Sequence, residues 1–270
     1  MYWMSKRTHL QKLLEAMQFI DVSIADKITT ITLNRPKVMN CINKAMHHEL
    51  HEAFDQFASD ITQRICVITG AGDKAFCAGS DLKDDALASS YPENGYAGLI
   101  ERFDLNKPVI AAVNGLALGG GFEVALACDI IIASSTAKFG LPEPMVGAVA
   151  LGGGLHRLSR QIGLKKAMGM ILTAQPVTAE EGSKLGFVTE TVEPEELQSV
   201  VDKYCNAILA CAPTAIEASK QTVMKGLDEK SLKDAIRHQA GYSAFKTWRE
   251  GPDAVEGPAA FTQKRKPVWK

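Results

Sequence analysis

Residues 107–133 read KPVIAAVNGLALGGGFEVALACDIIIA, and this stretch decides the fold class. It opens on a short apolar run that ends at an Asn-Gly turn, the form expected of a strand buried on both faces. Three consecutive glycines then precede a helical run, and a second apolar run, IIIA, follows the helix. A strand, a helix and another buried strand in this order predict an α/β core.

Two segments upstream fit the same scheme. Residues 27–33 alternate with period two and end at an Asn-Arg-Pro stop, and residues 64–69 form another short apolar run. Between them, residues 42–57 carry apolar side chains three and four positions apart, which predicts a helix. Strands starting near positions 28, 64, 108 and 130, with helices between most of them, predict strand-helix units at irregular spacing.

After about residue 193 the pattern becomes helical throughout. We expect helices over residues 194–211, 214–226 and 232–248. The chain is therefore divided into an N-terminal extension (1–19), a core (20–193) and a C-terminal helical region (194–270). Helices alone could hardly cover their own apolar faces in a region of this size, so we expect it to pack on the core or on another subunit.

The composition excludes several classes of protein. The 270 residues are 46% hydrophobic and 23% charged, as in globular proteins. The 30 basic and 31 acidic residues leave a net charge of −1, without the basic excess that binding to nucleic acid requires. The six cysteines form no CxxC pair and predict a reducing compartment. Because neither a long apolar window nor a signal peptide is evident, we expect a cytoplasmic protein without a membrane partner.

The three glycines, Gly119 to Gly121, and the helix after them predict a site that stabilises negative charge. Glycine lets a ligand approach the backbone closely, and the first turn of a helix presents unpaired N–H groups and the positive end of the helix dipole. Glu123 falls in this first turn. The dipole alone would favour a carboxylate there, so a purely structural role for Glu123 is the alternative.

A second carboxylate lies in FGLPEPMVG, residues 139–147. Glu143 stands between Pro142 and Pro144, which restrict the backbone and could fix the side chain for acid-base chemistry. The alternative is a solvated loop glutamate. Together with Glu123, Glu143 could form a pair of carboxyl groups in different environments, which is typical of a general acid and a general base.

Other motifs point to chemistry less strongly. Residues 70–75 contain G-x-G-x-x-A, but we expect a loop rather than a helix after it, which disfavours a dinucleotide site. Cys77 in that loop is interpreted as buried filler rather than as a nucleophile. The histidines of HHELH, residues 47–51, could bind zinc from one helix face, but a solvated face is favoured. The terminal KRKPVWK is either a soluble tail or a clamp on ligand phosphates.

Several motifs resemble those of the crotonase superfamily, the enoyl-CoA hydratases and isomerases. LNRPKVMNCIN, ICVITGAGDKAFCAGSDL and KFGLPEPMVGAVALGGG occur, together with the opening stretch, in the order typical of that family. The resemblance runs from about residue 20 to the C-terminus. It implies an α/β spiral of strand-strand-helix turns followed by a helical trimerisation region, assembled as a homotrimer or as a homohexamer of two trimers.

The resemblance also implies roles for individual residues. The backbone N–H groups of Ser80 and Gly120 would form an oxyanion hole around the thioester oxygen, and Glu123 and Glu143 match the two hydratase glutamates. Glu143 would donate the proton to carbon, and Glu123 would act as the base or orient the water. Eight further positions would contact the substrate or its CoA moiety, the last two of them often from a neighbouring subunit: Lys37, Met39, Ala78, Asp81, Leu82, Lys83, Phe261 and Lys264.

The activity implied is the reversible syn addition of water to a 2-enoyl-CoA thioester. A double-bond isomerase, which can work with one carboxylate, and a non-catalytic acyl-CoA-binding protein are the alternatives. No metal and no separate cofactor are expected, because CoA is part of the substrate.

The resemblance leaves the acyl group open. NGYAGLIERFDLNKPVIAAVNG and the C-terminal DAVEGPAAFTQKRKPVWK resemble most closely the members whose acyl group carries a trimethylammonium. Tyr96, Glu101 or Asp104 could supply the aromatic face or the carboxylate that such a cation needs. The proline and glycine usual in the loop after Glu143 are replaced by Ala150 and Leu151, and Met39 and the polar stretch 84–94 also lie where the family varies.

Overall fold

The computed structural model describes residues 17–84 and 91–270, so most of the predicted N-terminal extension and part of the variable polar stretch lie outside the described residues. The chain forms two compact units. The N-terminal unit contains the described part of Met1–Arg102 together with Val109–Val201, and the C-terminal unit contains Phe103–Pro108 and Asp202–Lys270. The division of the sequence at residue 193 stays a prediction.

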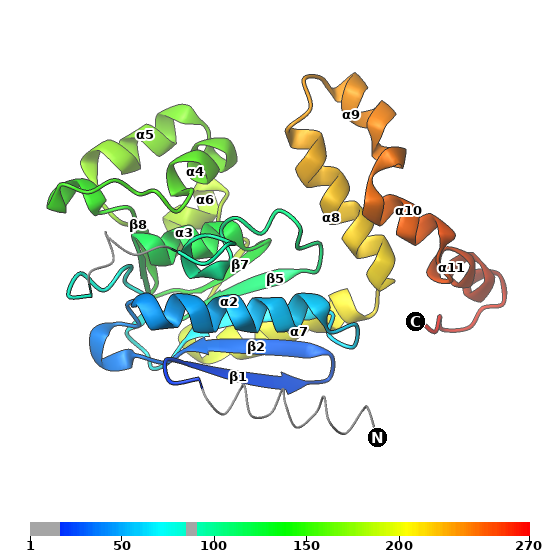
Figure 1. Ribbon diagram of the computed structural model, residues 1–270, viewed down its shortest axis with the longest axis horizontal. Helices are drawn as coiled ribbons and strands as arrows, with labels where there is room; N and C mark the ends of the chain where they lie inside the picture. The colour runs from blue at the N-terminus through cyan, green and yellow to red at the C-terminus, as the bar shows by residue number, and fades with distance from the viewer. Residues whose placement is uncertain (1–16, 85–90) are drawn as a thin grey trace. The chain divides into compact units, whose positions relative to one another are not determined.

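A six-stranded sheet forms the base of the N-terminal unit (Figure 1). Its strands, in spatial order, are β1 (Ile20–Ala25), β2 (Ile28–Leu33), β3 (Ile65–Gly70), β5 (Val109–Val113), β7 (Ile130–Ser134) and β10 (Glu190–Val192). β1 and β2 form an antiparallel hairpin, and every other neighbouring pair is parallel. All five residues of β5 are buried, which confirms the interpretation of its apolar run as a strand covered on both faces.

A second, four-stranded sheet alternates with the first along the chain. It consists of β4 (Ala75–Cys77), β6 (Leu116–Leu118), β8 (Lys138–Gly140) and β9 (Val177–Thr178). β3 leads to β4, β5 leads to β6 and then to helix α3 (Gly120–Ala127), and β7 leads to β8. This alternation confirms the spiral of strand-strand-helix turns. The loop expected around Cys77 was wrong in one respect: residues 75–77 pair with β6 as a strand too short to show periodicity.

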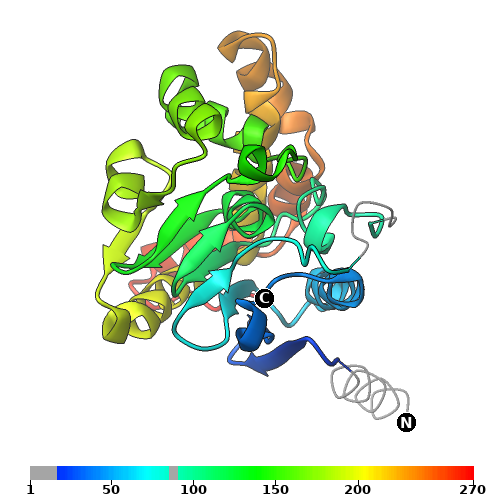
Figure 2. The same ribbon diagram turned by 90° about the vertical axis from the view of Figure 1, so that its left-hand side faces the viewer.

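Among the described residues, the N-terminal unit also contains the helices α2 (Lys44–Ser59), α4 (Gly154–Ile162), α5 (Leu164–Thr173) and α6 (Ala179–Leu185) (Figure 2). α2 confirms the helix predicted over 42–57. It begins after Asn43, whose side chain accepts a hydrogen bond from the backbone N–H of Met46 at 2.9 Å. Its apolar stripe, which includes Leu50 and Phe54, is fully buried and contributes to the core.

The boundary between the two units falls within helix α7 (Leu197–Leu209). The C-terminal unit then continues with α8 (Pro213–Leu227), α9 (Leu232–His238), α10 (Ser243–Glu250) and α11 (Asp253–Thr262). None of the helices in the described part of the chain is both long and apolar enough to cross a membrane.

The single helix expected over 232–248 is wrong, because the chain turns between α9 and α10. A short 3-10 segment, Gln239–Gly241, follows α9, and Tyr242 is extended with φ −70° and ψ 144°. Gln221 of α8 stabilises the new start, since its Oε1 accepts the backbone N–H of Ala244 at 2.8 Å. A side chain from another helix therefore stabilises the start of α10, and helical periodicity alone does not contain that information.

Candidate active site

The loop after β4 is held in place by the segment after η1 (Pro36–Val38). The N–H of Ala78 donates to the carbonyl of Met39 at 3.0 Å, and Ile42 and Gly79 are joined by a 2.9 Å bond. On the other side of Ser80, the N–H of Asp81 donates to the carbonyl of Ile42 at 2.9 Å. The N–H of Ser80 itself has no hydrogen-bond acceptor within residues 17–84 and 91–270, so it is available to a ligand.

Gly120 stands beside this loop as the first residue of α3. Its N–H is one of the unpaired groups at the helix N-terminus, where the helix dipole is positive. Gly79 brings the two segments together: its φ is +103°, and a Cβ at this position would lie 3.4 Å from the N atom of Gly120 and 3.1 Å from the carbonyl oxygen of Leu118. The structure therefore places the N–H groups of Ser80 and Gly120 on two neighbouring stretches of backbone.

Glu123 lies one turn into α3 and is 3% exposed. Its Oε1 accepts a 2.8 Å hydrogen bond from the backbone N–H of Gly154, the first residue of α4. Burial raises the pKa of Glu123 to about 7, although the N–H groups of Gly154 and Gly152 act in the opposite direction. The buried side chain is thus poised to exchange a proton near neutral pH, which goes beyond the capping role considered as an alternative.

Glu143 begins a 3-10 turn, Glu143–Val146, and is partly buried. Its Oε1 would lie 3.0 Å from a Cβ placed on Gly119, so the carboxylate reaches the glycine turn before α3. Its Oε2 is buried and has no hydrogen-bond partner among the described residues. Burial raises the pKa of Glu143, and its charge in turn raises the pKa of Glu123. The two carboxylates are therefore close enough to interact, and Glu143 is not a fully solvated loop residue.

Two residues that the sequence did not single out support the Ser80 loop. Asn40 is buried with a left-handed backbone (φ +54°), and its side chain accepts the N–H of Arg35 at 3.0 Å. The amide of Asn40 also donates to the carbonyls of Ala71 and Ala75, at 3.0 and 2.8 Å. The only sequence signal for this role is that asparagine tolerates the left-handed region.

Arg35 forms an ion pair with Asp81 at 2.8 Å and donates to the carbonyl of Cys41 at 2.6 Å. The hydrogen bond from Arg35 holds the pKa of Asp81 below its ordinary value. Asp81 also accepts the backbone N–H of Lys83 at 3.1 Å. The carboxylate of Asp81, expected near the substrate, is thus engaged in holding the loop, and its contact with substrate stays a prediction.

The prediction of a solvated face for HHELH was wrong for His47. His47 is 2% exposed, and its ring packs edge-on against Tyr91 and Tyr96, with centroid distances of 5.1 and 4.5 Å. Its Nδ1 accepts the backbone N–H of Ala97 at 2.9 Å. Burial lowers the pKa of His47 to about 4, so the ring is neutral at pH 7. Within the described residues, no cluster of three His, Cys, Asp or Glu side chains could hold a metal ion.

Cys77 is the last residue of β4, directly before the loop that contains Ser80. It is fully buried, and burial raises the pKa of its thiol to about 12, which disfavours the thiolate and hence a nucleophilic role. This agrees with its interpretation as filler. The G-x-G-x-x-A stretch runs into strand β4 rather than into a helix, so the arrangement required of a dinucleotide fingerprint is missing there.

The remaining predicted contact residues fall into two groups. Lys37, Met39, Ala78, Leu82 and Lys83 lie on the two paired segments that hold Ser80, and the side chains of Lys37, Leu82 and Lys83 are exposed. Phe261 and Lys264 belong to the C-terminal unit, where both are exposed and Phe261 is 88% accessible. Their roles at the site stay predictions.

The residues proposed for an acyl cation differ in their exposure and in the unit to which they belong. Tyr96 is buried, with its hydroxyl hydrogen-bonded to Ser80, whereas Glu101 is exposed and Asp104 belongs to the C-terminal unit. Beyond Glu143, Ala150 is buried and Leu151 is 83% exposed.

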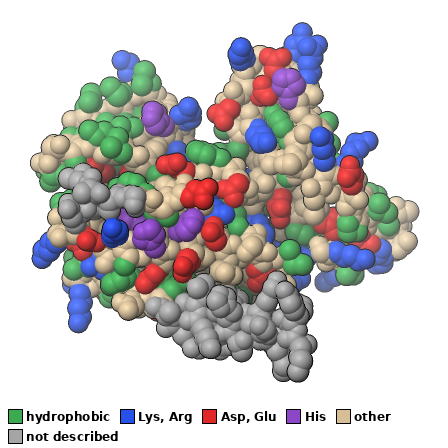
Figure 3. Space-filling view, in the orientation of Figure 1, with side chains coloured by type: hydrophobic (Ala, Val, Ile, Leu, Met, Phe, Trp, Pro, Cys, Tyr) green, Lys and Arg blue, Asp and Glu red, His purple; other side chains and the backbone are tan. Residues whose placement is uncertain are grey.

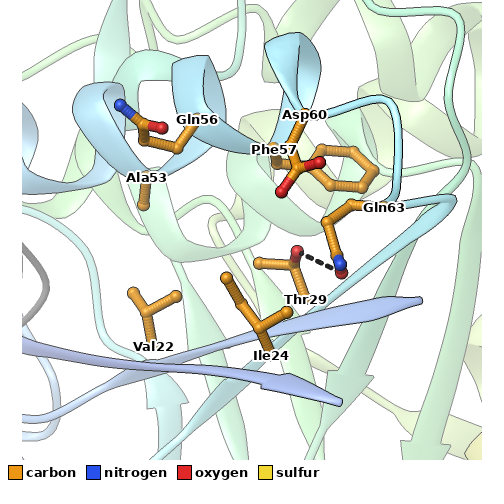
Figure 4. Close-up of a pocket in the computed structure, with 8 residues that line it drawn as sticks. All are labelled: Val22, Ile24, Thr29, Ala53, Gln56, Phe57, Asp60 and Gln63. Atoms are coloured by element: carbon orange, nitrogen blue, oxygen red, sulfur yellow. Dashed lines mark hydrogen bonds between the residues drawn. The ribbon is translucent and has the colours of Figure 1, made fainter. Parts of the chain in front are cut away.

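A pocket elsewhere in the N-terminal unit is a poor candidate for the site. It lies between the β1-β2 hairpin and α2 (Figure 4), and a 3.2 Å hydrogen bond from Thr29 to Gln63 crosses its wall. Its lining consists of Val22, Ile24, Thr29, Ala53, Gln56, Phe57, Asp60 and Gln63. None of the predicted site residues is among them, so the two glutamates and the paired N–H groups remain the candidate active site.

Comparison with known proteins shows the family of the chain. Residues 23–270 match the family described as enoyl-CoA hydratase/isomerase. The chain is 38% identical over 259 residues to a carnitinyl-CoA dehydratase of Proteus mirabilis (strain HI4320), covering 94% of this chain and 98% of that protein. It is 36% identical over 259 residues to an (E)-benzylidenesuccinyl-CoA hydratase of Thauera aromatica, covering 93% and 98%. Among solved structures, an enoyl-CoA hydratase from Mycobacterium tuberculosis H37Rv superposes with a TM-score of 0.87 at 36% identity, covering 94% and 99%.

Proposed function

Since this chain belongs to the enoyl-CoA hydratase/isomerase family, we propose that it is a hydratase that adds water, reversibly and with syn stereochemistry, to a 2-enoyl-CoA thioester. One observation carries this proposal. Two interacting carboxylates, buried Glu123 and partly buried Glu143, lie beside the glycine turn, where the N–H groups of Ser80 and Gly120 have no acceptor among the described residues. A hydratase needs both an anion-stabilising pair of donors and a pair of groups that can exchange protons with water.

The two N–H groups would form the oxyanion hole. When water attacks the β-carbon of an enoyl thioester, negative charge develops on the thioester oxygen. Fixed donors at that oxygen stabilise the transition state, and losing one such donor typically costs about 10²–10³ in rate. The N-terminus of α3 adds its positive dipole end at Gly120.

The two glutamates would divide the proton transfers. Glu123 would take a proton from the attacking water, because a pKa of about 7 places it near the best value for a base at neutral pH. Glu143 would supply the proton to the α-carbon, because its buried, unpartnered Oε2 favours the neutral carboxyl group. Both transfers from one side of the double bond give syn addition.

The cations on the Ser80 segments would bind the CoA moiety. The exposed side chains of Lys37 and Lys83 suit its phosphates, with Phe261 and Lys264 contributing from a neighbouring subunit. CoA enters as part of the substrate, and the mechanism requires neither a metal nor a separate cofactor.

For the acyl group, we favour a β-substituted enoyl thioester such as crotonobetainyl-CoA. Relatives named for carnitinyl-CoA and for benzylidenesuccinyl-CoA both share more than a third of their residues with this chain. Tyr91 supports this choice, because its half-exposed ring packs beside Tyr96 with 5.7 Å between centroids and offers a face to a cation or to a second ring. Tyr96, Glu101 and Asp104 stay candidates for contact with the same cation.

We also propose assembly into a homotrimer or a homohexamer in the cytoplasm. Exposed apolar side chains lie on α8 and α9 of the C-terminal unit: Val223, Met224, Leu227, Leu232 and Ile236. A second set lies on the N-terminal unit around α4 and α5 (Figure 3): Met145, Val149, Leu151, Leu164, Met168 and Leu172. Such faces are usually covered by a partner. Sedimentation of the purified chain gives its mass, and a monomer would contradict the assembly.

A panel of CoA thioesters tests the function. We expect hydration of crotonyl-CoA and faster hydration of crotonobetainyl-CoA. Conversion of a 3-enoyl-CoA without hydration of any 2-enoyl-CoA would identify an isomerase instead. Tight binding of CoA esters without any turnover would identify a non-catalytic acyl-CoA-binding protein, and either result would overturn the proposal.

A further inference from the structure

The hydroxyl of Tyr96 touches both residues of the proposed oxyanion hole. The Oγ–H of Ser80 donates a hydrogen bond to the Tyr96 hydroxyl at 3.2 Å. A Cβ placed on Gly120 would lie 2.2 Å from the same oxygen, so the hydroxyl stands directly against the backbone of Gly120. One phenol group thus links two stretches of backbone that are forty residues apart in the sequence.

The ring of Tyr96 is held firmly in this position. It is 4% exposed, and the His47 ring packs edge-on against it at 4.5 Å. Its neighbour Ala97 has a left-handed backbone (φ +56°) that is fixed by the 2.9 Å hydrogen bond from its N–H to His47. A side chain anchored in this way can transmit its own position to whatever it contacts.

The hydroxyl of Tyr96 also has a charge state that suits its position beside the proposed oxyanion hole. Burial holds the pKa of Tyr96 well above its ordinary value, so the group stays a neutral dipole and never adds negative charge beside a developing oxyanion. Its bond to Ser80 has a second effect. A serine hydroxyl without a partner tends to hydrogen-bond to backbone groups nearby, and here it could turn toward the unpaired N–H groups that the thioester oxygen needs.

We propose that Tyr96 is a positioning residue of the hydratase reaction, whose hydroxyl holds the Ser80 side chain away from the oxyanion hole and fixes Ser80 against Gly120. This inference rests on the proposed function of the same site. It goes beyond packing, because Tyr96→Phe keeps the ring and its contact with His47 while removing only the hydroxyl.

A double-mutant cycle tests the proposal. We expect Tyr96→Phe to lower kcat about three- to tenfold, the value of one lost hydrogen bond, while KM and the thermal midpoint change little. Ser80→Ala keeps the backbone N–H but removes the hydroxyl that could turn toward the oxyanion hole, so it should lower kcat no more than Tyr96→Phe does, and the double variant should be no slower than Tyr96→Phe. Tyr242→Phe is the matched control: it removes a hydroxyl bonded to Glu229 at 3.3 Å in the C-terminal unit, and it should leave kcat unchanged.

A second readout separates this proposal from the proposed function. Acetoacetyl-CoA ionises to an enolate that places negative charge on its oxygens, and its ultraviolet absorbance reports that ionisation on the enzyme. We expect the wild type to lower the pH at which bound acetoacetyl-CoA ionises, and Tyr96→Phe and Ser80→Ala to lower it less.

The outcomes are distinguishable. If the wild type hydrates no enoyl-CoA but the variants still weaken enolate formation, the function is wrong and the role of Tyr96 stands. If the wild type hydrates its substrate and Tyr96→Phe matches it in kcat and in enolate formation, the role of Tyr96 is overturned. Multiplicative losses in the double variant would also overturn it, because the two hydroxyls would then act independently.

Discussion

The backbone N–H of Gly154 donates a 2.8 Å hydrogen bond to Oε1 of Glu123, across 31 residues of sequence. Gly154 is the first residue of α4, and Glu123 lies in the first turn of α3. The carboxylate therefore faces the positive ends of two helices at once. This arrangement lets a nearly fully buried carboxyl group ionise close to neutral pH, as a general base must.

The glycines at the start of α4 leave room for Glu123. A Cβ on Gly152 would lie 2.5 Å from its Oε2, so we expect Gly152→Ala to displace the carboxylate and to lower kcat by roughly 10²-fold. Gly169→Ala in α5 is the control, because a Cβ there meets nothing within 4 Å, and it should keep full activity. Steady-state hydration rates of the two variants check this, and an active Gly152→Ala would mean that Glu123 does not need its observed position.

The rate should depend on pH through both glutamates. The reaction needs one carboxyl group of the pair ionised as base and the other protonated as acid. The raised pKa of Glu123, about 7, and the raised pKa of Glu143 belong to one interacting pair, so kcat/KM should fall on the acid side, where both groups are protonated, and on the alkaline side, where both are ionised. Rates measured from about pH 5 to pH 9 should give a bell whose two pKa values belong to the pair. A rate that does not change across this range would contradict the assignment.

His47 should make the fold less stable in acid. Its pKa is about 4 in the folded protein and 6.5 in the unfolded chain, so the unfolded chain binds the extra proton between these values. The stability contributed by the neutral ring is therefore complete above about pH 6.5 and declines as the pH falls toward 4, by up to about 3 kcal/mol. Denaturant unfolding of the wild type and of His47→Gln, which cannot titrate, isolates this contribution. If the wild type and His47→Gln differ in free energy of unfolding by the same amount at pH 6.5 and at pH 4, His47 is not buried as a neutral group.

Asn40 should contribute strongly to stability. Asn40→Ala removes its hydrogen bonds to Arg35, Ala71 and Ala75, leaves buried partners unsatisfied, and should lower the free energy of unfolding by roughly 3 kcal/mol. Asn34→Ala is the matched control, because the exposed amide of Asn34 makes a 2.7 Å bond to Asp21 and its loss should cost about 0.5 kcal/mol or less. Urea denaturation measures both, and equal losses would show that Asn40 does not hold the segment from Ala71 to Ala75.

Much of the fold followed from short-range patterns. The buried strands β3 and β5 were recognisable because a fully apolar run of that length bounded by turns has few other uses, and α2 because its apolar side chains share one face. Strands of two or three residues, such as β4 and β9, contain too few positions for a period to appear. The start of α10 after the break is stabilised by Gln221, a residue of another helix.

The candidate site also contains some residues that the sequence predicts and others that it does not. Glu123 and the glycine turn carry a local signal, because a carboxylate and flexible backbone at a helix start suggest anion chemistry by themselves. The closeness of Glu143, the support from Asn40 and the contact of Tyr96 with Ser80 and Gly120 arise only when distant segments pack together. His47 shows most clearly what a local pattern cannot predict. It shares a helix with exposed His48, yet its own ring is buried against two tyrosines.

The hydration of crotonyl-CoA by the wild type and by Glu123→Gln and Glu143→Gln tests the central claim most directly. Loss of the enoyl absorbance measures turnover, and the binding of a CoA thioester, measured in parallel, shows that each variant still has its site. We expect the wild type to hydrate the substrate, and each variant to bind it but to lose about 10²-fold or more in kcat. Turnover at the wild-type rate by either variant would contradict the two-glutamate mechanism.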